Sequence, residues 1–220
     1  MDNESDVVII SNEDLTIEQL VLVATSQAKL KLSEEIKQKV IDGRKIVDKI
    51  IEEEQIVYGI TTGVGENSKI RISSEDSIQL QKNLIMSHAC GVGEPLEKVQ
   101  VRAVMVMMVK NLSFGYSGIC LETVEMLVEL LNKDITPYVP KEGSLGYLIY
   151  QSHISLVLLG MGEAYYKGSL LKGEEVLEEA GVQSIELHEK EGLSLINGSV
   201  DMTALAALAI YNSINLLKNA

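Results

Sequence analysis

The sequence predicts a mostly α-helical protein, and three observations support this. Hydrophobic residues make up 46% of the chain, but it has one Phe and no Trp, so its core must be aliphatic, as in packed helices. Apolar residues recur at helical spacing after about the first dozen residues. Helix-start patterns precede several of these stretches. At 220 residues the chain is long enough for one hydrophobic core, and one unit over 1–220 is expected.

The elements follow in order along the chain. Thr16 to Gln19 form a capping-box pattern that predicts a first helix, and Ser33 before two glutamates predicts a second helix to about residue 53. Glycine, threonine and serine dominate residues 57–72, which indicates a mobile loop. Helices are then expected over about 74–88, 96–112, 120–132, 148–166 and 191–220. Gly and Pro interrupt them near 91–95 and 137–146, and a short polar stretch precedes the last helix.

The last predicted helix has an apolar stripe that nothing else in the chain is expected to cover. The stripe consists of Met202, Leu205, Ala206, Ala209, Ile210, Ile214 and Leu217. A helix with such a face normally packs against another segment. We therefore expect either a second half of the protein or a partner subunit.

Charge and composition exclude several classes of function. Nineteen basic and 32 acidic residues give a net charge of -13, which disfavours nucleic acid and anionic membrane surfaces as partners. The longest apolar runs fall short of the roughly 20 residues that cross a bilayer. The acidic N-terminus does not resemble a signal peptide, so a cytoplasmic protein is expected. Cys90 and Cys120 lie in no cysteine or histidine cluster, so we expect buried thiols and neither a metal site nor a disulfide.

Several stretches form an ordered set of motifs along the chain. Tyr58-Gly59-Ile60-Thr61-Thr62-Gly63-Val64-Gly65 is similar to the inner loop of ammonia-lyases of the histidine and aromatic amino-acid type, with Val64 in place of a Phe, and the motifs together resemble histidine ammonia-lyase most closely. The run from Gln81 to Leu96 contains the Ser-His-Ala and Gly-Val-Gly-Glu-Pro-Leu pattern of histidine ammonia-lyase. Further matches lie at 101–103, 116–118, 131–140 and 190–198. The resemblance covers nearly the whole chain.

The resemblance implies a fold, a reaction and a set of site residues. It implies an N-terminal helical domain over about 1–195, with the inner loop at 57–72, and the start of a long bundle helix at 196–220. The family eliminates ammonia non-oxidatively from L-histidine or a related aromatic amino acid. Tyr58 corresponds to the base that takes the β-proton, Asn197 positions the substrate or prosthetic group, and His88 contacts the substrate side chain. Gly65 of the loop belongs with the substrate-binding residues.

Each of these residues also has a simpler structural interpretation. Without the family, Tyr58 is a packing anchor beside a Gly-rich loop, and His88 is a hydrogen-bonded residue at a helix end. His153 lies in an apolar helical run and is expected to be a hydrogen-bonded core histidine.

One departure from the family concerns its chemistry. The family forms a methylidene-imidazolone electrophile from Ala-Ser-Gly, directly after a Gly-Ser-Val-Gly run. Here Gly143-Ser144-Leu145-Gly146 continues straight into Tyr147, three residues shorter, and Tyr147 replaces the following Asp. The chain has another Ser-Gly pair at Ser117-Gly118, but the family carries that pair in addition to its electrophile. No such prosthetic group is therefore expected in this chain.

Two hypotheses remain open. In the first, the chain is the N-terminal half or subunit of a histidine ammonia-lyase-like enzyme, completed in a homo-oligomer or by a complementary C-terminal-half chain. The family is about twice as long, and several subunits contribute to each of its active sites. In the second, the chain is a catalytically inactive pseudoenzyme: either a module that binds an amino acid or an assembly module that associates with an active homologue.

Overall fold

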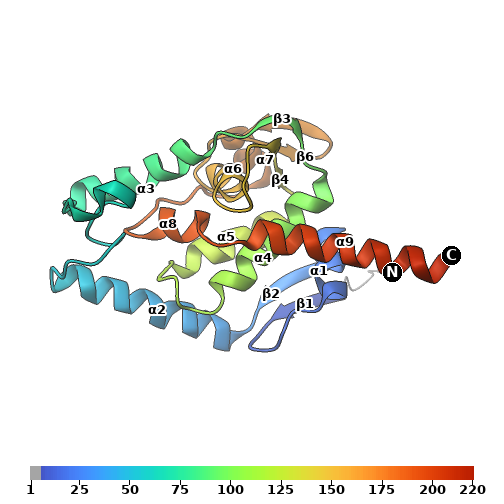
Figure 1. Ribbon diagram of the computed structural model, residues 1–220, viewed down its shortest axis with the longest axis horizontal. Helices are drawn as coiled ribbons and strands as arrows, with labels where there is room; N and C mark the ends of the chain where they lie inside the picture. The colour runs from blue at the N-terminus through green and yellow to red at the C-terminus, as the bar shows by residue number, and fades with distance from the viewer. Residues whose placement is uncertain (1–5) are drawn as a thin grey trace.

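The computed structural model describes residues 6–220 and is mostly α-helical, as the sequence predicts (Figure 1). The acidic opening run 1–5 lies outside the described residues. Helices α4 and α5 lie in the middle of the fold, while α2 and α3 extend to one side and α9 projects to the other (Figure 1). A single aliphatic core joins the helices.

The N-terminal segment contains β1 (Asp6–Ile10), α1 (Ile17–Ala24), β2 (Ala28–Leu32) and α2 (Glu34–Glu52). Both predicted helix starts are confirmed, because Thr16 forms a capping box with Gln19 and Ser33 accepts a hydrogen bond from the N–H of Ile36. The two strands were not predicted. They pair in parallel, and the buried and exposed residues of β2 alternate.

The centre of the fold is α4 (Lys98–Leu112), which is buried along most of its length. It packs against α1, α5 (Leu121–Asn132), α6 (Ile149–Leu158) and α9 (Val200–Asn219). Helix α3 (Ser74–His88) packs instead against α6 and α8 (Glu191–Ile196). The predicted limits of α3 and α5 agree with the structure to within a residue, whereas α4 begins two residues later than predicted.

The helix predicted over 148–166 is wrong beyond Leu158. Gly160 and Gly162 have φ of 70° and 65°, values that end a helix easily because glycine has no Cβ. The chain then forms the hairpin of β6 (Glu163–Tyr166) and β7 (Ser169–Lys172), which β4 (Thr136–Pro137) extends. The predicted polar stretch contains β7 and α7 (Gly173–Ala180). Strands β3 (Val92–Pro95) and β5 (Pro140–Glu142) pair with each other in a separate antiparallel sheet.

The predicted last helix is two helices, because the chain breaks at Asn197 and at Gly198, which has φ of 106°. Helix α9 buries Val200, Ala204 and Leu208. Most of the predicted apolar stripe is exposed, including Met202, Ile210, Ile214 and Leu217. In this protein the stripe is therefore an uncovered helix face.

Two details differ from the expectations drawn from the sequence. By length and hydropathy alone, the helical stretch Glu191–Asn219 is apolar enough to cross a membrane, which a search for unbroken apolar runs overlooked. Part of that stretch is buried within this fold, as in the core helix of a globular protein. Cys90 is exposed and Cys120 half-buried, so the expectation of two buried thiols is wrong.

Candidate functional site

The loop that carries Tyr58 closes on itself. The N–H of Gly65 donates to the Tyr58 hydroxyl at 3.1 Å, so two of the predicted site residues are in direct contact. The Thr62 hydroxyl, which is buried, accepts from the N–H of Gly59 and donates to the carbonyl of Gly63. Gly65 then opens the short 3-10 helix η1 (Gly65–Lys69). Tyr58 remains 56% exposed.

Helix α8 connects this loop to Asn197. A Cβ on Gly59 would lie 2.6 Å from Leu193 Cδ2, so the loop backbone lies directly against the helix. From α3, the Gln81 side chain accepts hydrogen bonds from the N–H groups of Gly192 and Leu193, at 3.0 and 3.4 Å. Asn197 is the residue at which α8 ends. The loop and Asn197 are therefore placed by the same short helix.

Asn197 is exposed and borders a cavity. Its Oδ1 accepts a hydrogen bond from the N–H of Gly198 at 2.9 Å. The cavity has a volume of about 340 Å³ and is also bordered by Phe114, Lys190 and Ser194. The Lys190 ammonium donates to the carbonyl of Ser117 at 2.5 Å. Burial, and to a lesser degree the nearby Arg44, lower the pKa of Lys190.

The third predicted residue, His88, stands apart. Its Nδ1 lies 2.8 Å from the carbonyl of Leu84 and 3.2 Å from the Ser87 hydroxyl, both within the last turn of α3. No hydrogen bond among residues 6–220 joins His88 to Tyr58, Gly65 or Asn197. The structure thus brings Tyr58 and Gly65 together beside the helix of Asn197, whereas His88 has only local partners.

The shortened segment at 143–148 is closed by a tight turn. The N–H of Ile149 donates to the carbonyl of Tyr147 at 2.9 Å, and Leu148 between them has φ of 70° and ψ of -56°. This is a γ-turn in a conformation that is strained for leucine. Gly146 has φ of 96°, and a Cβ there would lie 2.2 Å from Met202 Sδ, so a side chain at this position would be strained and would displace Met202. The segment lacks the Ala-Ser-Gly precursor, so its residues do not fit the family's electrophile.

Two buried polar side chains near this segment, Gln151 and Asp201, were missed by sequence reasoning. Gln151 is fully buried and donates to the carbonyl of Gly198 at 2.8 Å. Asp201 is 1% exposed and accepts from the Ser144 hydroxyl at 3.0 Å. The sequence offered one indication of their burial, because both residues lie within apolar helical stretches. Together they tie the shortened segment and α6 to the turn after Asn197.

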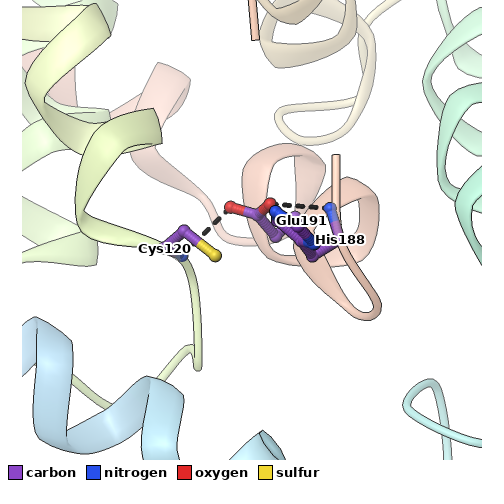
Figure 2. Close-up of side chains that lie close together, drawn as sticks. All are labelled: Cys120, His188 and Glu191. Atoms are coloured by element: carbon purple, nitrogen blue, oxygen red, sulfur yellow. Dashed lines mark hydrogen bonds between the residues drawn. The ribbon is translucent and has the colours of Figure 1, made fainter. Parts of the chain in front are cut away.

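Glu191 fixes the other end of α8. It is fully buried, and its Oε1 accepts from the N–H of Cys120 at 3.0 Å and from the Thr123 hydroxyl at 2.7 Å. Its Oε2 accepts from the N–H of His188 at 2.8 Å (Figure 2). Burial and the Glu191 carboxylate raise the pKa of the Cys120 thiol to about 12. One carboxylate thus joins the starts of α5 and α8.

His153 is hydrogen-bonded and partly buried, as expected, and this makes a pH dependence predictable. Its Nε2 accepts the N–H of Gly91 at 3.1 Å, and burial lowers its pKa. The fold therefore favours the neutral ring, and the free energy of unfolding should fall as the pH drops through the ordinary histidine pKa of about 6.5. In a His153→Gln variant, whose amide oxygen accepts the same bond without titrating, urea unfolding should show a smaller fall. Equal falls in both proteins would contradict this assignment.

Comparisons with known proteins give matches over nearly the whole chain. The family model described as aromatic amino acid lyase matches residues 15–220. A histidine ammonia-lyase of Alkaliphilus oremlandii is 48% identical over 214 residues, which cover 96% of this chain and 42% of that protein. The crystal structure of histidine ammonia-lyase from Trypanosoma cruzi superposes with a TM-score of 0.88 at 36% identity, over 93% of this chain and 40% of that one. Tyrosine aminomutase from Streptomyces globisporus gives a TM-score of 0.89 at 35% identity, over 94% and 39%. The chain thus spans about two fifths of the length of the curated relatives it matches.

Proposed function

Because the chain belongs to the aromatic amino acid lyase family, we propose that it forms the N-terminal half of a histidine ammonia-lyase-type site that binds an aromatic amino acid without eliminating ammonia through its own residues. The observation that carries this proposal is the combination of a shortened 143–148 segment with a Tyr58 loop and an Asn197 turn that match the family. L-Histidine is the ligand we expect to bind best, since the curated relatives named above are histidine ammonia-lyases.

Binding is supported by the side chains around Asn197. The amide offers both a donor and an acceptor, and the Lys190 ammonium lies on the same cavity wall, where it favours a carboxylate. The cavity volume of about 340 Å³ is sufficient for an amino acid. The exposed ring of Phe114 provides an apolar surface for an aromatic side chain.

The residues of this chain do not support elimination by themselves. The β-proton of an amino acid is weakly acidic and its amine is a poor leaving group, so a base such as Tyr58 needs an electrophile that activates the amine. The Ser144 hydroxyl donates a hydrogen bond to Asp201, and the chain turns at Leu148, so the shortened segment contains no group that could act as this electrophile. In the other Ser-Gly pair, the Ser117 carbonyl accepts hydrogen bonds from the Lys190 ammonium and the Ser194 hydroxyl.

Calorimetry tests the binding directly. L-Histidine should bind saturably and more tightly than L-tyrosine or L-phenylalanine, and Asn197→Ala should weaken it about tenfold, the loss of about one hydrogen bond to a charged group. Asn212→Ala, which removes an exposed asparagine of α9, is the matched control and should bind as the parent does. If the folded protein binds none of the three amino acids, the proposal fails and only an assembly role remains.

A second candidate function is elimination completed by another chain, and the contact between Tyr58 and Gly65 favours it. Urocanate absorbance should be followed with L-histidine for this chain alone and for its mixture with a histidine ammonia-lyase variant that keeps the Ala-Ser-Gly electrophile but lacks the loop tyrosine. We expect no urocanate from the chain alone and an intact mass equal to the plain sequence. Urocanate from the mixture would establish the second candidate, and urocanate from the chain alone would refute our proposal.

A further inference from the structure

Glu191 is a buried carboxylate without a cationic partner. It is fully buried, and the ion pairs found within residues 6–220 do not include it. The nearby guanidinium of Arg44 pairs instead with Asp48 at 2.7 Å and with Glu189 at 3.7 Å. A buried charge is normally paired with an opposite charge or bound to a metal. The three hydrogen bonds to Glu191 compensate part of this cost, but they supply no positive charge.

Two further ligand groups lie beside this carboxylate. The Cys120 sulfur, an imidazole nitrogen of His188 and an oxygen of Glu191 all lie within 4.8 Å of one another (Figure 2). Thiolate, imidazole and carboxylate are the three ligand types that zinc takes in proteins. Cys120 comes from the start of α5, whereas His188 and Glu191 flank the start of α8. Because the fold brings distant segments together here, the sequence alone predicted no metal site.

We infer that Cys120, His188 and Glu191 bind one divalent ion of the zinc type, with water as the fourth ligand. On binding, the S–H bond of Cys120 breaks, a metal–sulfur bond forms and the proton leaves to the buffer. Neighbouring ligands of a tetrahedral zinc lie about 3.3–3.8 Å apart, so separations of up to 4.8 Å must shorten by up to about 1.5 Å. His188 is exposed, and rotation of its side chain can provide this movement.

The hydrogen bonds of Glu191 leave a position for the ion. Its Oε1 already accepts from Cys120 and Thr123, but Oε2 accepts only from the N–H of His188. A carboxylate oxygen has two acceptor positions, so Oε2 keeps one for a metal. The ion would neutralise the buried charge and hold the start of α8 against α5. This site is separate from the amino-acid site, and its test does not depend on the proposed function.

Titration with cobalt(II), which replaces zinc and reports thiolate ligation by a near-ultraviolet charge-transfer band, tests the inference. We expect a band that saturates at one ion per chain and disappears when zinc is added. Cys120→Ser should abolish the band, whereas Cys90→Ser, which removes the exposed second cysteine, should leave it unchanged.

His188→Ala is the variant that keeps the test decisive, because its side chain is exposed and its backbone N–H still bonds to Glu191. It should lose stoichiometric binding while its circular dichroism matches that of the parent. Zinc should also raise the Tm of the parent but not that of His188→Ala. Absence of the band in folded parent protein, its persistence in His188→Ala, or its loss in Cys90→Ser would each overturn the assignment.

Discussion

Replacing Arg102 with alanine should lower the free energy of unfolding by about 3–5 kcal/mol. The side chain is 1% exposed at the centre of the fold. Its guanidinium donates to the carbonyls of Val23, Ala24 and Leu131, at 2.8, 2.9 and 3.1 Å. These carbonyls belong to the last turns of α1 and α5, where helices lack internal donors. The substitution removes the hydrogen bond to the Ala24 carbonyl and one of the hydrogen bonds to each of the Val23 and Leu131 carbonyls, which also accept from the N–H groups of Ser26 and Asp134. It also opens a cavity between the helices.

Asp134 adds to this effect but does not dominate it. Its carboxylate lies 3.3 Å from Arg102 and keeps two other partners, Lys98 and Ser26, when the arginine is removed. Urea unfolding of Arg102→Ala provides the measurement. Arg71→Ala serves as the matched control, because Arg71 pairs with Glu54 at the surface and should contribute less than about 1 kcal/mol. A change at Arg102 as small as that at Arg71 would show that the buried contacts contribute little.

Sequence reasoning succeeded where structure is determined locally. The starts of α1 and α2 were predictable because Thr16 and Ser33 cap residues only three positions away. Strands β1 and β2 were not predictable, since each is only five residues long and they pair with each other across the intervening helix α1. The end of α6 was missed because an apolar run masked Gly160 and Gly162.

The candidate site divides in the same way. The resemblance to the family pointed to Tyr58, Gly65 and Asn197, and the structure adds that a hydrogen bond joins the first two. Gln151 was not identified because its partner, the carbonyl of Gly198, lies on another element. The group around Glu191 was missed for the same reason. Contacts between segments far apart in the chain leave no recognisable pattern in the neighbouring sequence, so they could not be predicted from it.

The glycine at position 43 shows how such a contact can reverse a local rule. Gly43 lies inside α2, where alanine normally stabilises a helix by about 1 kcal/mol. A Cβ at this position would lie 1.9 Å from the carbonyl oxygen of Gly115, which is backbone and cannot rotate away. Gly115 in turn has φ of 78°, and its own Cβ would lie 2.6 Å from the carbonyl oxygen of Lys39. The two segments therefore touch backbone to backbone.

We accordingly expect Gly43→Ala to destabilise the protein by about 2–3 kcal/mol, because α2 must separate from the turn at Gly115. Phe114 lies in that turn and borders the cavity of Asn197, so L-histidine binding should weaken as well. Gln38→Ala, at an exposed position of the same helix, should change stability by less than about 0.5 kcal/mol and leave binding intact. Urea unfolding and calorimetry on the parent, Gly43→Ala and Gln38→Ala distinguish an effect of helix propensity from an effect of the backbone contact. If Gly43→Ala is more stable than the parent, helix propensity outweighs the contact between backbones and α2 does not position the cavity wall.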